Sequence, residues 1–120
     1  ASFIGLALVL PPTQHLLTPK GCIVALVKPQ FEAGRGQVGA GGVVRDPAIH
    51  RRVIEEVAAT ATQSGLVVAG IVVSPAPGPA GNIEFLLHLR RSGPAADMDA
   101  AIDSALRAAE QLRRRNAKAG

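Results

Sequence analysis

The chain has 120 residues, of which 48% are hydrophobic and only 2% aromatic, and 13 basic against 9 acidic residues give a formal charge of +4. The apolar fraction excludes a disordered chain, and no apolar run reaches the roughly 18 to 20 residues that a membrane-spanning helix needs. The single cysteine, Cys22, excludes an internal disulfide, so a secreted, disulfide-rich scaffold is not indicated. Because the first residue is alanine and not methionine, we expect the chain to begin inside a longer protein.

The first third of the chain predicts a helix, a strand and a loop. An apolar segment containing Pro11 and Pro12 is interpreted as an irregular helix over 6–17. The run Cys22–Val27 has no polar alternation, which is typical of a strand buried on both faces, as in a parallel sheet. Residues 30–45 include five glycines and predict a long loop, of a kind that is usually functional or mobile.

The middle of the chain predicts a helix followed by two strands. Asp46 as N-cap and Pro47 at the first helical position begin a helix that runs to about residue 64 and is capped by Gly65. A second strand of the buried type covers 66–73, and a third, partly alternating strand covers 83–89 after a turn rich in proline and glycine.

The last element is an amphipathic helix over 97–114, followed by a tail over 116–120 that we expect to fray. Three strands and about three helices in this order indicate an α/β fold. Strands buried on both faces need neighbouring strands and helices on both sides of the sheet. We therefore expect the missing neighbours upstream of Ala1.

Several motifs carry a resemblance to a known family. They are Ser2-Phe3-Ile4, Lys28-Pro29-Gln30-Phe31-Glu32-Ala33-Gly34, Gly41-Gly42-Val43-Val44-Arg45-Asp46-Pro47 and Gly78-Pro79-Ala80-Gly81-Asn82-Ile83-Glu84. In order and spacing they resemble the TlyA (hemolysin A) family of FtsJ-like ribosomal RNA 2′-O-methyltransferases, which use S-adenosylmethionine. The resemblance implies a Rossmann-like fold, with residues 1–92 as the C-terminal half of the methyltransferase domain and 93–120 as a C-terminal helix and tail.

The resemblance also implies the site. The family's catalytic group is a Lys-Asp-Lys-Glu tetrad, whose second lysine falls on Lys28 and whose glutamate falls on Glu84. The aspartate would stand directly before Ala1, and the first lysine further upstream. Phe3 is a possible wall of the cofactor pocket. With most of the cofactor site upstream, the resemblance implies a part of an rRNA (cytidine) 2′-O-methyltransferase that is inactive by itself.

The chemistry of the reaction suits these residue types. A ribose hydroxyl is a poor nucleophile, so a base must take its proton, and a lysine can do so only when burial or a second cation makes its amine available near neutral pH. Lys28 follows a strand, where open α/β sheets bind ligands. The alternatives are a solvated strand-end lysine and, for Glu84, a polar residue at the edge of a strand.

RNA contacts and metal binding are less specific in the sequence. Arg35 and Arg45 in the glycine-rich segment are candidate contacts to RNA phosphates, although solvated surface arginines would look the same. The charge of +4 fits an RNA partner without proving one. The three histidines are scattered and no metal-ligand spacing is present, so we expect no metal site.

Two other hypotheses stay open. The chain could be a catalytically inactive module that complements a missing half or forms homo-oligomers through the unpaired edge of its sheet. Membrane lysis, which the hemolysin label suggests, has little support, since no strongly amphipathic basic helix stands out. The resemblance implies ribosomal RNA or ribosomal subunits as the partner and no contact with a membrane. We therefore expect the protein in the cytoplasm.

Overall fold

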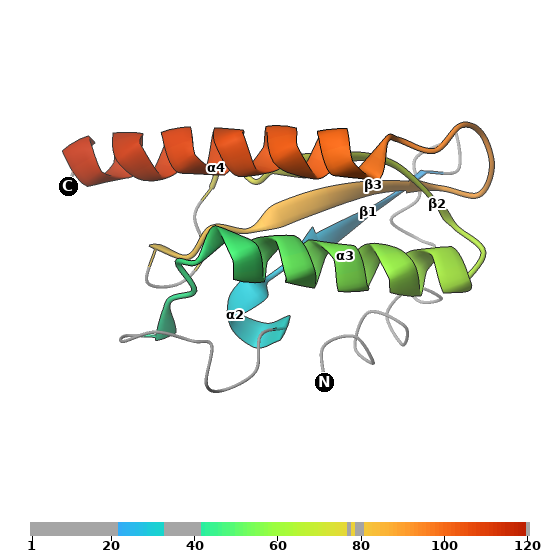
Figure 1. The fold of residues 1–120 in the computed structure, drawn as a ribbon, viewed down its shortest axis with the longest axis horizontal. Helices are drawn as coiled ribbons and strands as arrows, with labels where there is room; N and C mark the ends of the chain where they lie inside the picture. Colours follow the sequence, from blue (N-terminus) through green and yellow to red (C-terminus); the bar gives the residue numbers. More distant parts are fainter. Residues whose placement is uncertain (1–21, 33–41, 77, 79–80, 120) are drawn as a thin grey trace.

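The computed structural model describes residues 22–32, 42–76, 78 and 81–119. The expected helix over 6–17, Phe3 and Arg35 lie outside these described residues. The elements, in chain order, are β1 (Cys22–Val27), α2 (Pro29–Glu32), α3 (Pro47–Gln63), β2 (Val67–Val73), β3 (Phe85–Arg90) and α4 (Met98–Ala119), as Figure 1 shows. This arrangement confirms the expected α/β class.

The described strands form one sheet in the order β1-β3-β2. The expectation of a parallel sheet is wrong for β3, which lies between β1 and β2 and runs antiparallel to both. The physical reason is in the connections. The chain passes from β1 to β2 through α3, a crossover that lets these two strands run in the same direction, whereas β2 is followed in the chain by its antiparallel neighbour β3.

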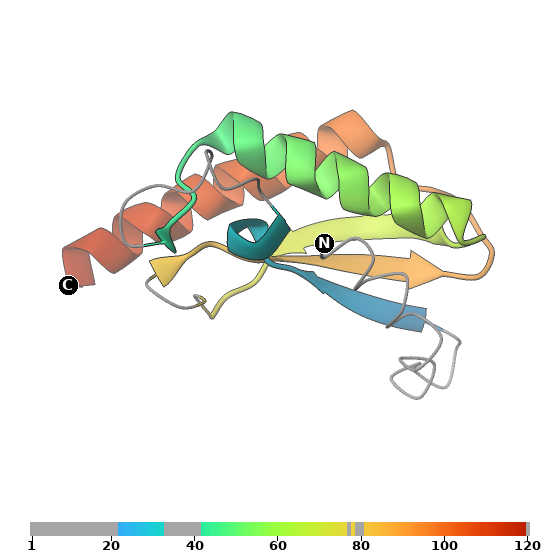
Figure 2. The same ribbon diagram turned by 90° about the horizontal axis from the view of Figure 1, so that it is seen from below.

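One face of the sheet is covered and the other is open within the described part of the chain. Both α3 and α4 lie on the same side of the strands (Figure 2). Within the described residues β1 and β2 are therefore covered on one face only, and the expectation that further helices cover the other face stays a prediction. Val24, Leu26 and Val72 are 48%, 47% and 57% exposed, while Ile23 and Ala25, which point to the helices, are buried. A strand sequence that is apolar at every position thus indicates two apolar faces, but it does not show whether other elements cover both of them.

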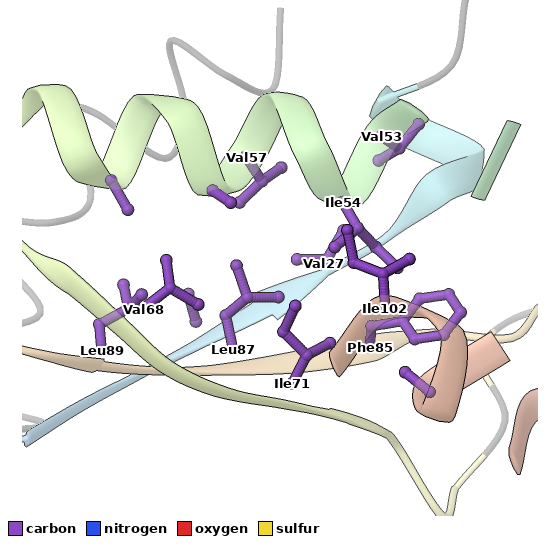
Figure 3. Close-up of a cluster of buried hydrophobic side chains, with 14 of the residues drawn as sticks. Val27, Val53, Ile54, Val57, Val68, Ile71, Phe85, Leu87, Leu89 and Ile102 are labelled. Atoms are coloured by element: carbon purple, nitrogen blue, oxygen red, sulfur yellow. The ribbon is translucent and has the colours of Figure 1, made fainter. Parts of the chain in front are cut away.

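The core forms between the covered face and the two helices. Figure 3 shows Ile54 and Val57 of α3 pointing toward Leu87 and Phe85 of β3. Ile54, Leu87 and Phe85 are fully buried, as is Ile102 of α4. Burying a large apolar side chain of this kind stabilises a fold by about 1.5 to 3 kcal/mol, so this cluster holds the strand ends in place.

The predicted ends of α3 are confirmed with one change. Asp46 is the N-cap, its Oδ1 accepts a hydrogen bond from the Ala48 N–H at 2.9 Å, and Pro47 is the first helical residue. The helix ends with Ser64 as the C-cap, and Gly65 is the residue after the cap, with a φ of +84°. A left-handed conformation at that position is favoured by glycine, so the residue identified from the sequence does end the helix, one position later.

Two other boundaries differ from the sequence expectation. The expected loop from residue 30 begins instead with the single turn of α2, which starts at Pro29. The expected frayed tail from residue 116 is wrong, because α4 continues to Ala119. Asp97 accepts a hydrogen bond from the Ala100 N–H at its start, and Arg51 of α3 pairs with Asp103 of α4. No helix of the described part of the chain is long and apolar enough to cross a membrane.

Candidate active site

The ends of the three strands bring Lys28 and Glu84 together. Val27 pairs with Phe85 in the β1–β3 ladder, so the register continued by one position sets Lys28 opposite Glu84. Lys28 Nζ lies 4.0 Å from Glu84 Oε2. On the other side of β3, the Ser74 N–H donates to the Glu84 carbonyl oxygen at 2.8 Å. Two residues that are 56 positions apart in the sequence are therefore neighbours, at the ends where β1 and β2 finish.

The pair differs strongly in burial. The Glu84 side chain is 7% exposed, whereas the Lys28 side chain is 41% exposed. A buried carboxylate needs hydrogen-bond donors or a cation beside it, because an uncompensated charge away from water is costly. The Lys28 ammonium group lies 5.8 Å from the centre of the Phe31 ring, and that ring is 61% exposed. Lys28 thus reaches from the buried carboxylate toward solvent.

Gln30 and Gly78 complete the surroundings of the Glu84 carboxylate. Gln30 Nε2 donates a hydrogen bond to Glu84 Oε2 at 2.8 Å. A Cβ atom added at Gly78 would lie 2.2 Å from Oε2 and 2.6 Å from Cδ, so only glycine leaves room for this carboxylate. Sequence reasoning did not assign a role to either residue. Both lie within the distinctive motifs around Lys28 and Glu84, and that position is the signal that could have identified them.

Asn82 ties the turn before β3 to the segment that leads into α3. Its Oδ1 accepts from the Val44 N–H at 3.0 Å, and its Nδ2 donates to the Gly42 carbonyl oxygen at 2.9 Å. The Asn82 side chain is almost fully buried. Because both contacts are to main-chain atoms, this side chain holds residues 42–44 beside the turn that carries Glu84.

Arg45 is not part of the Lys28–Glu84 pair. It is exposed and lines a separate hollow of about 160 Å³ together with His50 and Arg113. His50 Nε2 lies 2.9 Å from the Val44 carbonyl oxygen, which can only accept, so the ring nitrogen is the donor. Burial lowers the pKa of His50 below its ordinary value of 6.5, the contact with Val44 opposes this shift, and the ring is neutral at pH 7. His50 thus links the first turn of α3 to the main chain of Val44 at the wall of this hollow.

Neither of two hollows in the described part of the chain has Lys28 or Glu84 in its wall. The first hollow is lined by other residues, and a second hollow of about 560 Å³ lies at the opposite end of the sheet, near Val67, Leu66 and Met98. Phe3, the one residue expected to contact the cofactor, lies outside the described residues. No group of three or more histidine, cysteine, aspartate or glutamate side chains that could hold a metal ion occurs within the ranges that the structure describes.

The comparison with known families decides which kind of protein this is. A model of FtsJ-like methyltransferases matches residues 1–91, which include Lys28, Gln30 and Glu84. The chain belongs to the FtsJ-like methyltransferase family. Members of this family generally use S-adenosylmethionine as the methyl donor. The match ends one residue after β3, before α4 begins.

Individual relatives confirm the resemblance to the TlyA and hemolysin A group. The chain is 51% identical over 89 residues to the 16S/23S rRNA (cytidine-2′-O)-methyltransferase TlyA of Mycobacterium tuberculosis, which covers 74% of this chain and 33% of that protein. It is 34% identical over 87 residues to hemolysin A of Brachyspira hyodysenteriae, covering 72% of this chain and 36% of that one. The chain thus spans about a third of the length of these curated relatives.

The fold of this FtsJ-like chain also has a close match among solved structures. The structure of a candidate hemolysin from Streptococcus thermophilus aligns with a TM-score of 0.79 at 44% identity. The alignment covers 98% of this chain and 43% of that one, so it includes α4 as well as the sheet. The arrangement of strand ends that joins Lys28 to Glu84 is therefore built on a backbone shared with this relative.

Proposed function

We propose that this chain is the part of an rRNA ribose 2′-O-methyltransferase that supplies the base and one carboxylate of the active site. The observation that carries the proposal is the contact between Lys28 and the buried Glu84 at the ends of the strands. The relative TlyA, 51% identical, is an rRNA (cytidine-2′-O)-methyltransferase, which supports ribosomal RNA as the substrate. Ribosomal RNA as the substrate supports a cytoplasmic location of the protein.

In this proposal Lys28 acts on the ribose hydroxyl, as the base that takes its proton or as the cation that polarises it. Glu84 then balances the positive charge of the ammonium group from the protein side, at the 4.0 Å separation seen here. The methyl group comes from S-adenosylmethionine. Phe3 is proposed to contact this donor, and Arg35 and Arg45 to contact RNA phosphates. We propose that residues other than Lys28 and Glu84 form most of the site for this donor.

The direct test is a methyl-transfer assay with the complete gene product that carries these residues. With labelled S-adenosylmethionine and ribosomal RNA, label is expected on a ribose 2′ oxygen, which nuclease digestion and mass spectrometry identify. The 120-residue chain alone is expected to transfer no methyl group and to show no tight binding of S-adenosylmethionine in calorimetry. Methylation of a base, or of no RNA at all, would show that the proposal is wrong.

A second proposal concerns the 120-residue chain on its own: we infer that it self-associates through its sheet. Among the described residues, β1 and β2 are edge strands whose outer sides have no ladder partner. The open face carries Val24, Leu26 and Val72, all about half exposed. Unpaired strand edges and exposed apolar patches both favour association with another chain.

Self-association is expected to appear as dimers or larger species in sedimentation velocity at micromolar concentrations. Leu26→Lys places a charge on the open face, next to the β1 edge, and is expected to shift the distribution toward monomer. Gln63→Lys, on the exposed face of α3, adds the same charge away from the sheet and is the matched control. A monodisperse monomer of the unchanged chain throughout this range would contradict the proposal.

A further inference from the structure

The side chain of Gln30 is held in one orientation by Glu84. Gln30 is the second residue of α2, two positions after Lys28, and its Nε2 lies 2.8 Å from Glu84 Oε2. An ionised carboxylate has no proton to donate, so only the amide nitrogen can face it. The amide oxygen of Gln30 must then point in another direction.

That amide oxygen is buried without a partner. Gln30 Oε1 is inaccessible to solvent, and no donor in the part of the chain that the structure describes lies within hydrogen-bond distance of it. Leaving a buried acceptor unpaired destabilises a fold, and such atoms are rare in native proteins. A hydrophobic side chain of similar length would fill the same space without this penalty. Such a side chain would also remove a donor from the buried Glu84 carboxylate, so the unpaired oxygen accompanies the hydrogen bond that Gln30 gives to Glu84.

The hydrogen bond acts on the same carboxylate oxygen that faces Lys28. Glu84 Oε2 is 2.8 Å from Gln30 Nε2 and 4.0 Å from Lys28 Nζ. A Cβ atom at Gly78 would overlap with the same oxygen, so the missing side chain at Gly78 leaves room for it. A hydrogen bond and close packing at one oxygen favour a fixed position of the carboxylate, which charge balance at a reacting group requires.

We propose that Gln30 is a positioning residue of the methyl-transfer site, which fixes Glu84 opposite Lys28 at the expense of its own unpaired oxygen. This inference rests on the proposed function, in which Lys28 acts on the ribose hydroxyl and Glu84 balances its charge. Gln30 touches neither the RNA nor the methyl donor in this role. It acts through the orientation of Glu84 alone.

The decisive variants are Gln30→Met and Gln30→Glu, studied in the complete gene product. Methionine has a similar length but no donor, so we expect kcat for RNA methylation to fall about 10- to 100-fold, the range for a lost hydrogen bond to a charged group. The KM for RNA is expected to stay the same, whereas the free energy of unfolding measured with urea is expected to fall, because the buried Glu84 carboxylate loses a hydrogen-bond donor. Glutamate adds repulsion against Glu84 and is expected to lower kcat further than methionine does. Gln63→Met on the exposed face of α3 is the matched control.

A merely structural role predicts another pattern. In that case the KM for RNA changes together with kcat, or glutamate and methionine have equal effects on kcat, and either result would overturn the inference. An unchanged kcat in Gln30→Met would overturn it as well.

A measurement that does not depend on methyl transfer separates this inference from the proposed function. In the 120-residue chain, the side-chain amide resonances of Gln30 are expected to shift in NMR spectra when Glu84 is replaced by methionine, since their acceptor is lost. Unshifted resonances would overturn the positioning contact even if RNA is methylated. If the resonances shift but the complete gene product methylates no RNA, the contact stands and the proposed function is the part that fails.

Discussion

Replacement of Lys28 by alanine in the complete gene product is expected to lower kcat for rRNA methylation by about 10²- to 10⁴-fold, the usual contribution of a positioned acid or base. The side chain is 41% exposed and extends from the end of β1, so its removal leaves no cavity in the core and the fold is expected to persist. Label transfer measures the activity, and circular dichroism checks the fold. Full activity of the alanine variant would exclude Lys28 from the reaction.

A second variant separates the two roles open to Lys28. Arginine keeps the positive charge but does not release its proton at any ordinary pH. Lys28→Arg is therefore expected to be as inactive as the alanine variant if Lys28 is the base, and to recover part of the activity if Lys28 only polarises the hydroxyl. Arg90→Ala is the matched control, because it removes one exposed positive charge at the opposite end of β3. A similar loss in that control would indicate a general effect of charge on RNA binding.

Replacement of Gly78 by alanine is expected to reduce kcat by about 10²-fold, although Gly78 has no functional group. The added Cβ would lie 2.2 Å from Glu84 Oε2, a distance that forces the carboxylate to move. A displacement of about 1 Å in a catalytic group can lower the rate to this extent. The overpacked side chain is also expected to lower the free energy of unfolding by about 1 to 3 kcal/mol, which thermal or urea unfolding measures.

Two further variants test why Gly78→Ala is expected to lower kcat and stability. Gly70→Ala in β2 is the matched control, since its nearest neighbour, the His88 Cβ, would be 4.0 Å away, an ordinary contact. Combining Gly78→Ala with Glu84→Asp shortens the carboxylate and is expected to recover stability but not activity. If stability is not recovered, the contact between Gly78 and Glu84 is not what the alanine disturbs.

Most of the elements could be predicted because their signals are local. Asp46 and Pro47 begin α3 and Gly65 follows its end, since a side-chain cap, a fixed φ and a left-handed residue act within one turn. The strand Cys22–Val27 was predicted with its exact bounds from its β-branched composition. The end of α4 was misjudged, because the helix was expected to stop near residue 114 and to be followed by a frayed tail over 116–120, whereas it continues to Ala119.

The candidate site could be predicted only in part. Lys28 and Glu84 were identified from the resemblance, and their places at strand ends followed from the sequence. Gln30 and Gly78 were missed, because their importance depends on a carboxylate that lies 54 and 6 residues further along the chain. The roles of Phe3 and Arg35 remain predictions, since both residues lie outside the described part of the chain.

The sequence by itself determined the α/β class, the family resemblance and most of the helices and strands, because caps, turns and composition act over a few residues. Only the tertiary structure decided that β3 lies between β1 and β2 with the opposite direction, and that one apolar face of this sheet is left open by α3 and α4. Strand pairing joins residues that are far apart in the chain, and an apolar run is compatible with either direction. The register that sets Lys28 opposite Glu84 is a property of that pairing, so the contact on which the proposed function depends exists only in the folded chain.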